Sequence, residues 1–389
     1  MSYKTIQLSK TADIIIGFPF ASEKFNINAQ GIRLVRGKNI TTGNLRWGDD
    51  TRWWDDSSID LSKYMLKADD IVIGMDGSLV GKNYAKISEN DLPLLLVQRV
   101  ACIRAKEGYD QRFLWGCIAS GKFERYIDSI KTGTSIPHIS GGQIGNYLIP
   151  DFDLPTQKKI AAILSALDEK IATNRAINDN LQQQAAALFS SLYDRSNTEV
   201  RFTDLIQILG GGTPKTGENT YWNGNIAFFT PKDVGTPYTL ITEKTITEEG
   251  LSHCNSRLYP VNTVFVTARG TVGKVGMSGV PMAMNQSCYA LVGKETHQLL
   301  VYFYTLKAVD RLKHKASGAV FDAITTRDFE SEQIMKLSDD DATAFLRVAE
   351  PMFQEVLNNN IENLRLSTLR DSLLPKLMSG EIDVSDIQL

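Results

Sequence analysis

The stretch PTQKKIAAILSALDEKIATNRAINDNLQQQAAALFSSLY, residues 155–193, decides how the rest of the chain is interpreted. It contains no Gly, and its one proline, Pro155, lies at its start, where a helix tolerates proline. At about 1.5 Å per residue the helix would be about 55–60 Å long, too long for one small domain, so we expect it to link two. Apolar residues recur at steps of three and four, which places them in one stripe along a helix: Ile160, Ile163, Leu164, Leu167, Ile171, Ile177, Leu181, Leu188 and Leu192.

A second helix of the same kind is predicted near the C-terminus. It follows Ser338 and three aspartates, which form a natural N-cap cluster, and Gly380 is the expected C-cap. Pro351 predicts a kink or a restart early in this helix. Two such helices most simply pack together as an antiparallel coiled coil. The seam of the second helix is formed by Phe345, Val348, Met352, Val356, Ile361, Leu364, Leu369, Leu373 and Leu377.

Length and composition indicate two or three ordinary globular domains. The 389 residues are 42% hydrophobic and 22% charged, as in typical globular proteins. The apolar runs are too short to cross a bilayer, and the start of the chain lacks an apolar signal region, so we expect a cytoplasmic protein without a membrane partner. The cysteines form no C-x-x-C pair and are expected to be free thiols in cores: Cys102, Cys117, Cys254 and Cys288.

The net charge of −3 is unevenly distributed. Residues 1–150 carry about +3 and residues 201–336 about +2, whereas residues 151–200 carry about −2 and residues 337–389 about −6. The acidity is therefore concentrated in the helical segments. Two mildly basic globular regions are compatible with contact to DNA, although many enzymes show the same balance.

The two globular regions follow one plan. Residues 4–150 contain strand-like runs at 14–16, 32–35, 66–75 and 94–103, then a helical stretch at 111–130. Equivalent features recur about 185–197 residues later, and this drifting offset excludes a solenoid and indicates a domain duplication. The correspondences are Leu8 with Leu205, Gly17-Phe18-Pro19 with Gly212-Thr213-Pro214, residues 75–82 with 268–274, Gln98 with Gln286, and Thr132-Gly133 with Ser317-Gly318.

The predicted fold class is therefore α+β: two similar mixed α/β globular domains separated by two long helices packed as an antiparallel coiled coil. The predicted segments are a first domain at 1–150, a first long helix at 151–197, a second domain at 198–337, and a second long helix with a C-terminal tail at 338–389.

No catalytic motif stands out in the sequence. The four histidines show neither H-E-x-x-H nor another metal-ligand spacing, so they are expected on the surface or in loops and no metal site is predicted. Gly210 to Thr216 is better interpreted as a Gly-rich turn than as a phosphate-binding loop, because Pro214 directly precedes Lys215 and has no N–H for a phosphate. No G-x-G-x-x-G follows a strand. Asp151 and Asp153 are interpreted as capping residues of the long helix.

Basic, polar and aromatic residues gather on the loops of both regions. Lys and Arg contact phosphates, whereas Arg, Asn and Gln read base edges. Turns at Gly77 and Gly270 allow close approach of the backbone to a phosphate. A solvated loop explains any one of these residues equally well. The candidate DNA-binding residues are Arg36, Lys38, Arg46, Trp47, Arg52, Ser78, Lys82, Lys232, Arg269, Thr271, Lys274, Lys313 and Arg327.

Several stretches resemble the specificity subunit of type I restriction-modification enzymes. They are 157–161, 168–171, 174–175 and 369–382 in the helices, together with 211–215 and 230–234. The resemblance covers essentially the whole chain. It implies two target-recognition domains, each reading one half of a split, asymmetric DNA site through the major groove, and no catalysis by this chain.

The resemblance also implies partners. The paired helices would be a ruler between the half-sites and docking surfaces for two methyltransferase subunits. S-adenosylmethionine, ATP and Mg would belong to those subunits and to separate restriction/translocase subunits, with no cofactor in this chain. Two alternatives stay open: a scaffold that only bridges proteins, which predicts no DNA sequence preference, and an enzyme with an unrecognised site.

Overall fold

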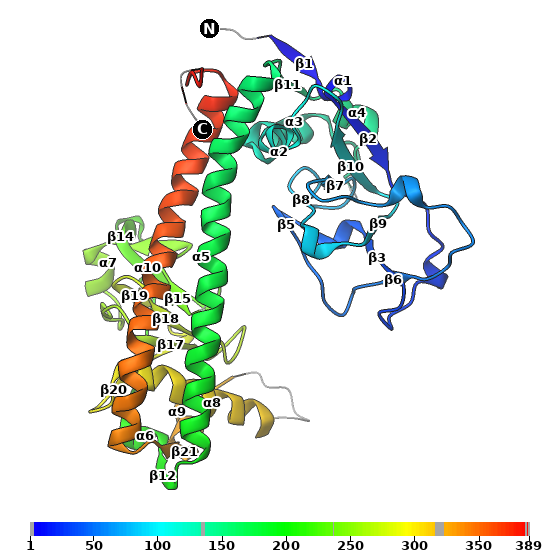
Figure 1. Cartoon of the computed structure of the whole chain (residues 1–389). Helices are drawn as coiled ribbons and strands as arrows, with labels where there is room; N and C mark the ends of the chain where they lie inside the picture. Colours follow the sequence, from blue (N-terminus) through cyan, green and yellow to red (C-terminus); the bar gives the residue numbers. More distant parts are fainter. Residues whose placement is uncertain (1–3, 134–136, 236, 316–322, 386, 388–389) are drawn as a thin grey trace. The chain divides into compact units, whose positions relative to one another are not determined.

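The computed structural model describes residues 4–133, 137–235, 237–315, 323–385 and 387. The chain forms two compact units. Unit 1 comprises Met1–Lys170 and Leu366–Leu389, and unit 2 comprises Ile171–Arg365. Each unit therefore combines one globular part with one section of each long helix, α5 (Leu154–Asp194) and α10 (Asp339–Met378) (Figure 1).

The globular part of unit 1 is built on an antiparallel sheet with the strand order β2-β10-β7-β8. A second sheet, β6-β3-β9, contains the parallel pair β3–β9. Helices α2 and α3 bury Phe113, Phe123 and Ile127 in one core with Ile71 and Ile103 of the sheet. The elements are β1 (Thr5–Gln7), α1 (Leu8–Thr11), β2 (Ala12–Ile16), η1 (Ser22–Lys24), β3 (Ile32–Val35), η2 (Gly37–Asn39), β4 (Ile40–Thr41), β5 (Asn44–Leu45), β6 (Trp53–Trp54), η3 (Ser62–Tyr64), β7 (Ile71–Gly74), β8 (Tyr84–Lys86), η4 (Glu89–Asp91), β9 (Leu94–Leu96), β10 (Val100–Ala105), α2 (Gln111–Ala119), α3 (Gly121–Ile130), α4 (Gly141–Gly145) and β11 (Leu148–Pro150).

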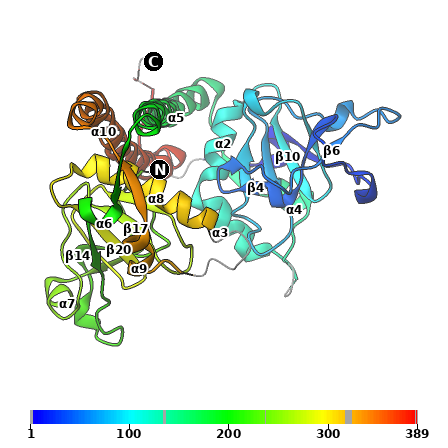
Figure 2. The ribbon, with the colours of Figure 1, turned by 90° about the horizontal axis from the view of Figure 1, so that it is seen from below.

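Unit 2 contains a five-stranded sheet, β13-β20-β17-β18-β15, and a three-stranded sheet, β16-β14-β19. Helix α8 lies between the larger sheet and the helix pair (Figure 2), and its Phe303 shares a core with Phe189 of α5 and Phe345 of α10. The elements are β12 (Thr198–Arg201), α6 (Phe202–Leu205), β13 (Ile206–Gly210), η5 (Asn219–Tyr221), β14 (Trp222–Phe229), β15 (Tyr238–Thr239), β16 (Lys244–Ile246), α7 (Glu248–Ser252), β17 (Val264–Thr267), β18 (Val275–Ser278), β19 (Met282–Met284), β20 (Cys288–Gly293), α8 (Gln298–Lys315), α9 (Thr326–Ser331) and β21 (Gln333–Lys336).

The two globular parts share one topology, which confirms the predicted duplication. In each, the first strand pairs with the last, β1 with β11 and β12 with β21, and the order β2-β10-β7-β8 recurs as β13-β20-β17-β18. The offset falls from 193 residues, Thr5 to Thr198, to 185 residues, Leu148 to Gln333. Shorter connections in the second copy therefore account for the drift.

Two predicted correspondences are wrong in detail. Leu8 opens α1 and is equivalent to Phe202, which opens α6, and not to Leu205; both residues are fully buried. Gly17 is equivalent to Gly211, since a Cβ on either would lie within 2.1–2.2 Å of a carbonyl oxygen on the equivalent turn. Ser317-Gly318 lies outside the described residues.

Several predicted elements are shorter than expected. Residues 94–103 form two strands, β9 and β10, separated by a turn, and 66–75 contains only β7, Ile71–Gly74. The helical stretch 111–130 breaks at Ser120, which is the C-cap of α2 and the N-cap of α3. None of these three stretches contains a Pro, which would have indicated where the element ends.

The long helices pack in antiparallel fashion within each unit. In unit 1, Arg370 pairs with Asp168 at 2.8 Å. In unit 2, Asn174 donates to Asn363 at 3.0 Å and Asn359 donates to Asn178 at 2.9 Å. As the position on α5 rises, the partner's position on α10 falls, which confirms the expected antiparallel pairing.

The seam contains polar residues that the apolar pattern did not reveal. Asn174, Asn178 and Asn359 are buried, whereas the predicted seam residues Ile177, Val348 and Leu369 are exposed, so their assignment to the seam is wrong. The phase of each helix is set by its large buried residues, and Ile177 and Val348 fall one residue outside it. Buried seam residues are Ile160, Leu164, Ile171, Leu192, Phe345, Val356 and Leu377, and half-buried ones are Ile163, Leu167, Leu181, Leu188, Met352, Ile361, Leu364 and Leu373.

The expected restart at Pro351 does not occur, because α10 continues from Asp339 to Met378. Ala349 before the proline and Phe353 after it are buried in one core, so tertiary packing holds the helix across it. Three of the predicted capping residues, Ser338, Asp153 and Gly380, are confirmed. The Asp341 N–H donates to the Ser338 hydroxyl at 3.1 Å, the Thr156 N–H donates to Asp153 at 2.9 Å, and Gly380 adopts φ +65° after α10.

Candidate nucleic-acid interface

One turn joins the loops that carry the candidate residues of unit 1. It comprises Val97–Arg99 between β9 and β10, and we call it the hub turn. The Val97 N–H donates to Val35 at the end of β3 (3.2 Å), and the Met75 N–H after β7 donates to the Arg99 carbonyl (2.9 Å). A Cβ on Gly17 would lie 2.1 Å from the Val97 carbonyl oxygen, so only glycine permits this approach after β2. The connections that follow β2, β3 and β7 therefore meet at one place.

Unit 2 repeats the arrangement around Asn285–Ser287, its own hub turn. The Asn285 N–H donates to Phe229 at the end of β14 (2.9 Å), and the Ala268 N–H after β17 donates to the Ser287 carbonyl (2.8 Å). A Cβ on Gly211 would lie 2.2 Å from the Asn285 carbonyl oxygen. Residues 211–215, 230–233 and 268–274 thus leave one hub turn, as 17–20, 36–39 and 75–82 do in unit 1.

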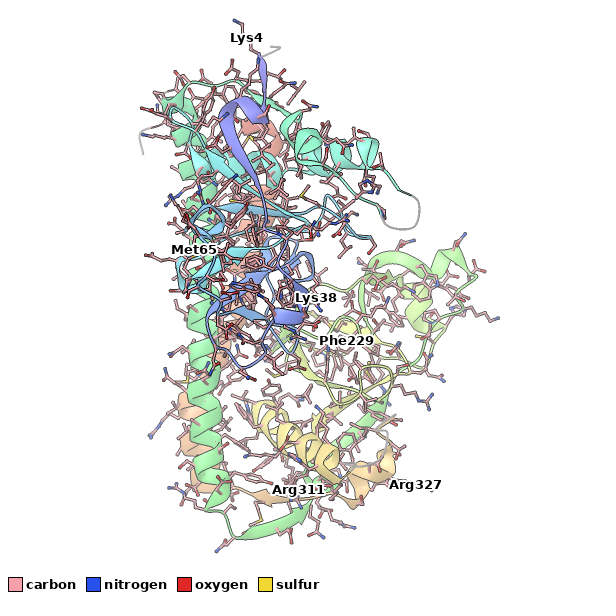
Figure 3. All side chains as sticks on the ribbon, turned by 90° about the vertical axis from the view of Figure 1, so that its right-hand side faces the viewer. Lys4, Lys38, Met65, Phe229, Arg311 and Arg327 are labelled. Atoms are coloured by element: carbon pink, nitrogen blue, oxygen red, sulfur yellow. The ribbon has the colours of Figure 1, made fainter. Side chains whose placement is uncertain are left out.

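The candidates of the first globular part fall into two groups. One group lies around residues 49–50, which contact Arg36, Lys38 and Arg52, and Arg46 belongs to it through Lys38. Figure 3 labels Lys38 on η2. Lys38 pairs with the Asp50 carboxylate at 2.6 Å, Arg36 donates to the Asp50 carbonyl, Arg46 donates to the Lys38 carbonyl at 3.4 Å, and Arg52 donates to the Asp49 carbonyl at 2.9 Å. Ser78 and Lys82 lie on the 75–82 loop, where Lys82 pairs with Glu124 at 2.9 Å.

The pKa values of these groups shift as a result of the same ion pairs and of burial. The hydrogen bond from Lys38, and then its charge, hold the pKa of Asp50 below its usual value. The hydrogen bond to Glu124 raises the pKa of Lys82. Burial, followed by the neighbouring Arg52 cation, lowers the pKa of Arg36. The indole N–H of Trp47 donates to Asp91 at 3.1 Å, and the Arg33 guanidinium lies 4.7 Å from its ring centroid, so contacts within the first globular part hold Trp47.

The candidates of the second globular part are less engaged. Thr271 donates to the Pro231 carbonyl at 3.3 Å, which brings the 230–233 and 268–274 loops together, and Lys232 lies 3.6 Å from Glu243. Gly273, with φ +73°, lies against Lys313 of α8, whose Cε would be 2.6 Å from a Cβ there. No side-chain hydrogen bond or ion pair within the described part of the chain holds four exposed cations, Arg269, Lys274, Lys313 and Arg327.

Gly77 and Gly270 have φ values of +95° and +83°, so both turns require the left-handed backbone that the sequence predicted. Arg269 pairs through its backbone with Ala323, and α9, which carries Arg327, begins three residues later (Figure 3). The segment that leads into α9 therefore begins beside the 268–274 loop.

Sequence reasoning missed Gln98, Arg99 and Gln286 as candidates. All three are exposed on the hub turns, and Arg99 adopts φ +68°, which is uncommon for a residue with a side chain. The only signal available in the sequence was the correspondence of Gln98 with Gln286. In the sequence alone, nothing distinguished the two glutamines and Arg99 from other polar residues on the surface.

Other classes of site find no support in the part of the chain that the structure describes. No group of three or more His, Cys, Asp or Glu side chains there could hold a metal ion, and all four histidines are exposed. Cys102, Cys117 and Cys288 are buried and Cys254 is half-buried, all as free thiols. Burial raises the pKa of each buried thiol, that of Cys288 to about 12, which makes them unreactive at neutral pH. Among the described helices none is long and apolar enough to cross a membrane.

Comparisons with known proteins agree with the resemblance. The chain matches the family model described as type I restriction modification DNA specificity domain twice, over residues 20–183 and 195–336. It is 22% identical to the type I restriction enzyme MjaIX specificity subunit of Methanocaldococcus jannaschii, covering 78% of this chain and 76% of the relative. It is 24% identical to the HindI specificity subunit of Haemophilus influenzae, covering 69% and 77% respectively.

A similar fold occurs in the crystal structure of the type I restriction-modification S subunit from M. genitalium. The TM-score is 0.63 at 15% sequence identity, and the match covers 97% of this chain and 96% of that one. At that identity the likeness supports the fold alone. Because the family model covers well over half of the chain in two copies, we conclude that this protein belongs to the family of type I restriction-modification DNA specificity subunits.

Proposed function

We propose that this chain reads a bipartite, asymmetric DNA sequence, with one globular domain on each half-site, bounded at 1–150 and 198–337. The observation that carries the proposal is the duplicated hub turn. In each domain three connections leave it together, and they hold Lys and Arg beside glycine turns with positive φ. Cations that contact phosphates position a protein on DNA, while exposed amides and guanidinium groups read base edges.

The two long helices, at 151–197 and 338–389 with the tail, form the second part of the proposal. They set the distance between the half-sites and dock two methyltransferase subunits. Support comes from the length of α5 and α10, 41 and 40 residues, and from exposed apolar residues such as Ile177 and Leu369 on them. Restriction/translocase subunits complete the assembly, which acts in the cytoplasm.

The chemistry belongs to the partners in this proposal. S-adenosylmethionine would be bound by the methyltransferase subunits, and ATP and Mg by the restriction/translocase subunits. This chain would contribute sequence recognition and no catalysis, as expected of a member of a family of specificity subunits. An enzyme with an unrecognised site would instead modify DNA or hydrolyse ATP as the purified chain alone.

The test replaces three exposed cations of the second domain, Lys232, Arg269 and Lys274, with Ala in the complex with methyltransferase subunits. Removing one phosphate-binding cation lowers the slope of log affinity against log salt by about 0.9, so we expect a decrease of about 2–3 together with weaker binding. Affinity is measured at several salt concentrations on a duplex that carries the DNA motif methylated by the wild-type complex.

A matched control removes the same charge elsewhere on unit 2. Arg201, Lys294 and Lys336 lie on or next to β12, β20 and β21, away from the hub turn, and their replacement with Ala should leave the slope unchanged. If the complex with Lys232, Arg269 and Lys274 replaced had the same salt slope as the wild-type complex, these three residues would not contact phosphates. If the complex selected no motif from randomised duplexes, the result would instead favour a scaffold that only bridges proteins.

A further inference from the structure

Gln98 and Gln286 occupy the same place in the two domains. Each is the central residue of its hub turn, Val97–Arg99 or Asn285–Ser287, and each side chain is exposed. Hydrogen bonds clamp the backbone on both sides, from Val97 to Val35 and from Met75 to Arg99 in unit 1, with equivalent bonds in unit 2. The two amides are therefore presented from rigid backbone and not from the flexible tips of the loops.

The connections that flank these glutamines carry cations in both domains. In unit 2 the flanking connections carry Lys232, Arg269 and Lys274, which are exposed cations. In unit 1 they carry Lys38 and Lys82. Each glutamine thus lies on the turn from which the connections that carry these cations leave, whereas its own side chain is neutral and offers both a donor and an acceptor.

A hydroxyl orients one of the two amides. The Thr213 hydroxyl, on the connection after β13, donates to Oε1 of Gln286. A carbonyl oxygen has two lone pairs, so Oε1 retains one acceptor position while the NH₂ group retains its donors. This is the pattern needed for a bidentate pair with the N6 and N7 edge of adenine in the major groove. Thr213 is therefore a positioning residue for Gln286.

Arg99 adds a feature peculiar to unit 1. Arg99 adopts φ +68°, its side chain is exposed, and its guanidinium lies 3.7 Å from the Asp76 carboxylate. A backbone conformation that is unfavourable for a residue with a side chain persists where the surrounding structure imposes it, and such residues concentrate at functional sites. The hub turn of unit 1 thus exposes two neighbouring side chains able to read base edges.

We propose that Gln98 and Gln286 are equivalent base readers, one for each half-site, with an adenine edge as the preferred partner. The proposal rests on the proposed function, since it assumes that each domain lies on one half of the target. It assigns a direct reading role to the hub turns and leaves the cations on the surrounding loops to contact phosphates.

The experiment maps methylated motifs in DNA treated with the full complex that carries wild-type chain, Gln98→Ala or Gln286→Ala. Each substitution should relax one base position in one half-site, by about tenfold to a hundredfold in discrimination. The other half-site and the gap between the half-sites should not change. Thr213→Val should weaken discrimination at the position affected by Gln286→Ala, because the amide loses its orienting hydroxyl but stays in place.

Gln207→Ala is the matched control, because Gln207 is also exposed and lies at the other end of β13 from Gly211. Its motif should equal that of wild type. A motif that stays the same in both glutamine variants would overturn this inference alone. Uniformly weaker binding, with a shallower salt slope and no relaxed position, would also overturn it. A wild-type complex without any sequence motif would overturn the proposed function as well.

Discussion

The two globular domains share a backbone plan but differ in how their basic side chains are used. Both anchor three connections on a hub turn through equivalent hydrogen bonds. In the first domain Lys38 and Lys82 are paired with Asp50 and Glu124. In the second, within the described part of the chain, Arg269, Lys274, Lys313 and Arg327 are exposed without a side-chain partner.

This difference separates what the duplicated fold requires from what each domain does with it. The close approach of glycine to the hub turn is a requirement of the backbone, so it recurs. The ionic partners lie on loops, whose side chains vary without altering the sheet. We infer that the second domain supplies more of the electrostatic attraction to DNA, and that the first relies more on contacts other than charge.

The largest effect is expected at the hub turns, which the two domains share. Gly211→Ala places a Cβ 2.2 Å from a backbone oxygen, and Gly17→Ala does the same at 2.1 Å. Forced overpacking of this kind costs about 1–3 kcal/mol, and more where backbone must move. Both substitutions should lower the free energy of unfolding, measured by denaturant titration.

Gly210→Ala is the adjacent control, because no atom lies within 4 Å of a Cβ at that position. It should leave the free energy of unfolding within about 0.5 kcal/mol of the wild-type value. A destabilised Gly211→Ala protein together with an unaffected Gly17→Ala protein would show that the two hub turns are not equivalent.

The next effect tests the difference in charge. Replacing Lys38, Arg46 and Lys82 with Ala in the first domain should reduce the salt slope by less than the roughly 2–3 expected for the second-domain triple variant. The reason is that two of these three cations, Lys38 and Lys82, already have a carboxylate counter-ion at 2.6 and 2.9 Å. Equal reductions for the two triple variants would contradict the inferred division between the domains.

A converse substitution serves as the control. Asp50→Asn removes the carboxylate that holds Lys38 at 2.6 Å and should therefore release this cation. If Lys38 then reaches a phosphate, the salt slope should steepen by about 0.9. No change would mean that Lys38 points away from the DNA even when it is free.

The sequence predicted the long helices well, because a repeat of three and four residues is a strong local signal. It failed where a polar residue belongs to the apolar seam, as for Asn178, and assigned the neighbouring Ile177 in its place. It also missed the turn at Gln98-Arg99, since neither residue announces a turn and the φ of Arg99 is imposed by the bonds around it. The loop candidates were recognisable by residue type, but their ion pairs depend on tertiary contacts.

The proposed role of α5 and α10 is to set the distance between the two half-sites on DNA. Its most direct test duplicates seven residues in each helix, 174–180 and 356–362, which preserves the heptad pattern of the seam. The duplication adds about 10 Å to the helix pair, or about three base pairs at 3.4 Å each. Methylated motifs are then mapped with the full complex. We predict unchanged half-sites with a gap longer by about three base pairs; unchanged half-sites with the original gap would contradict the account.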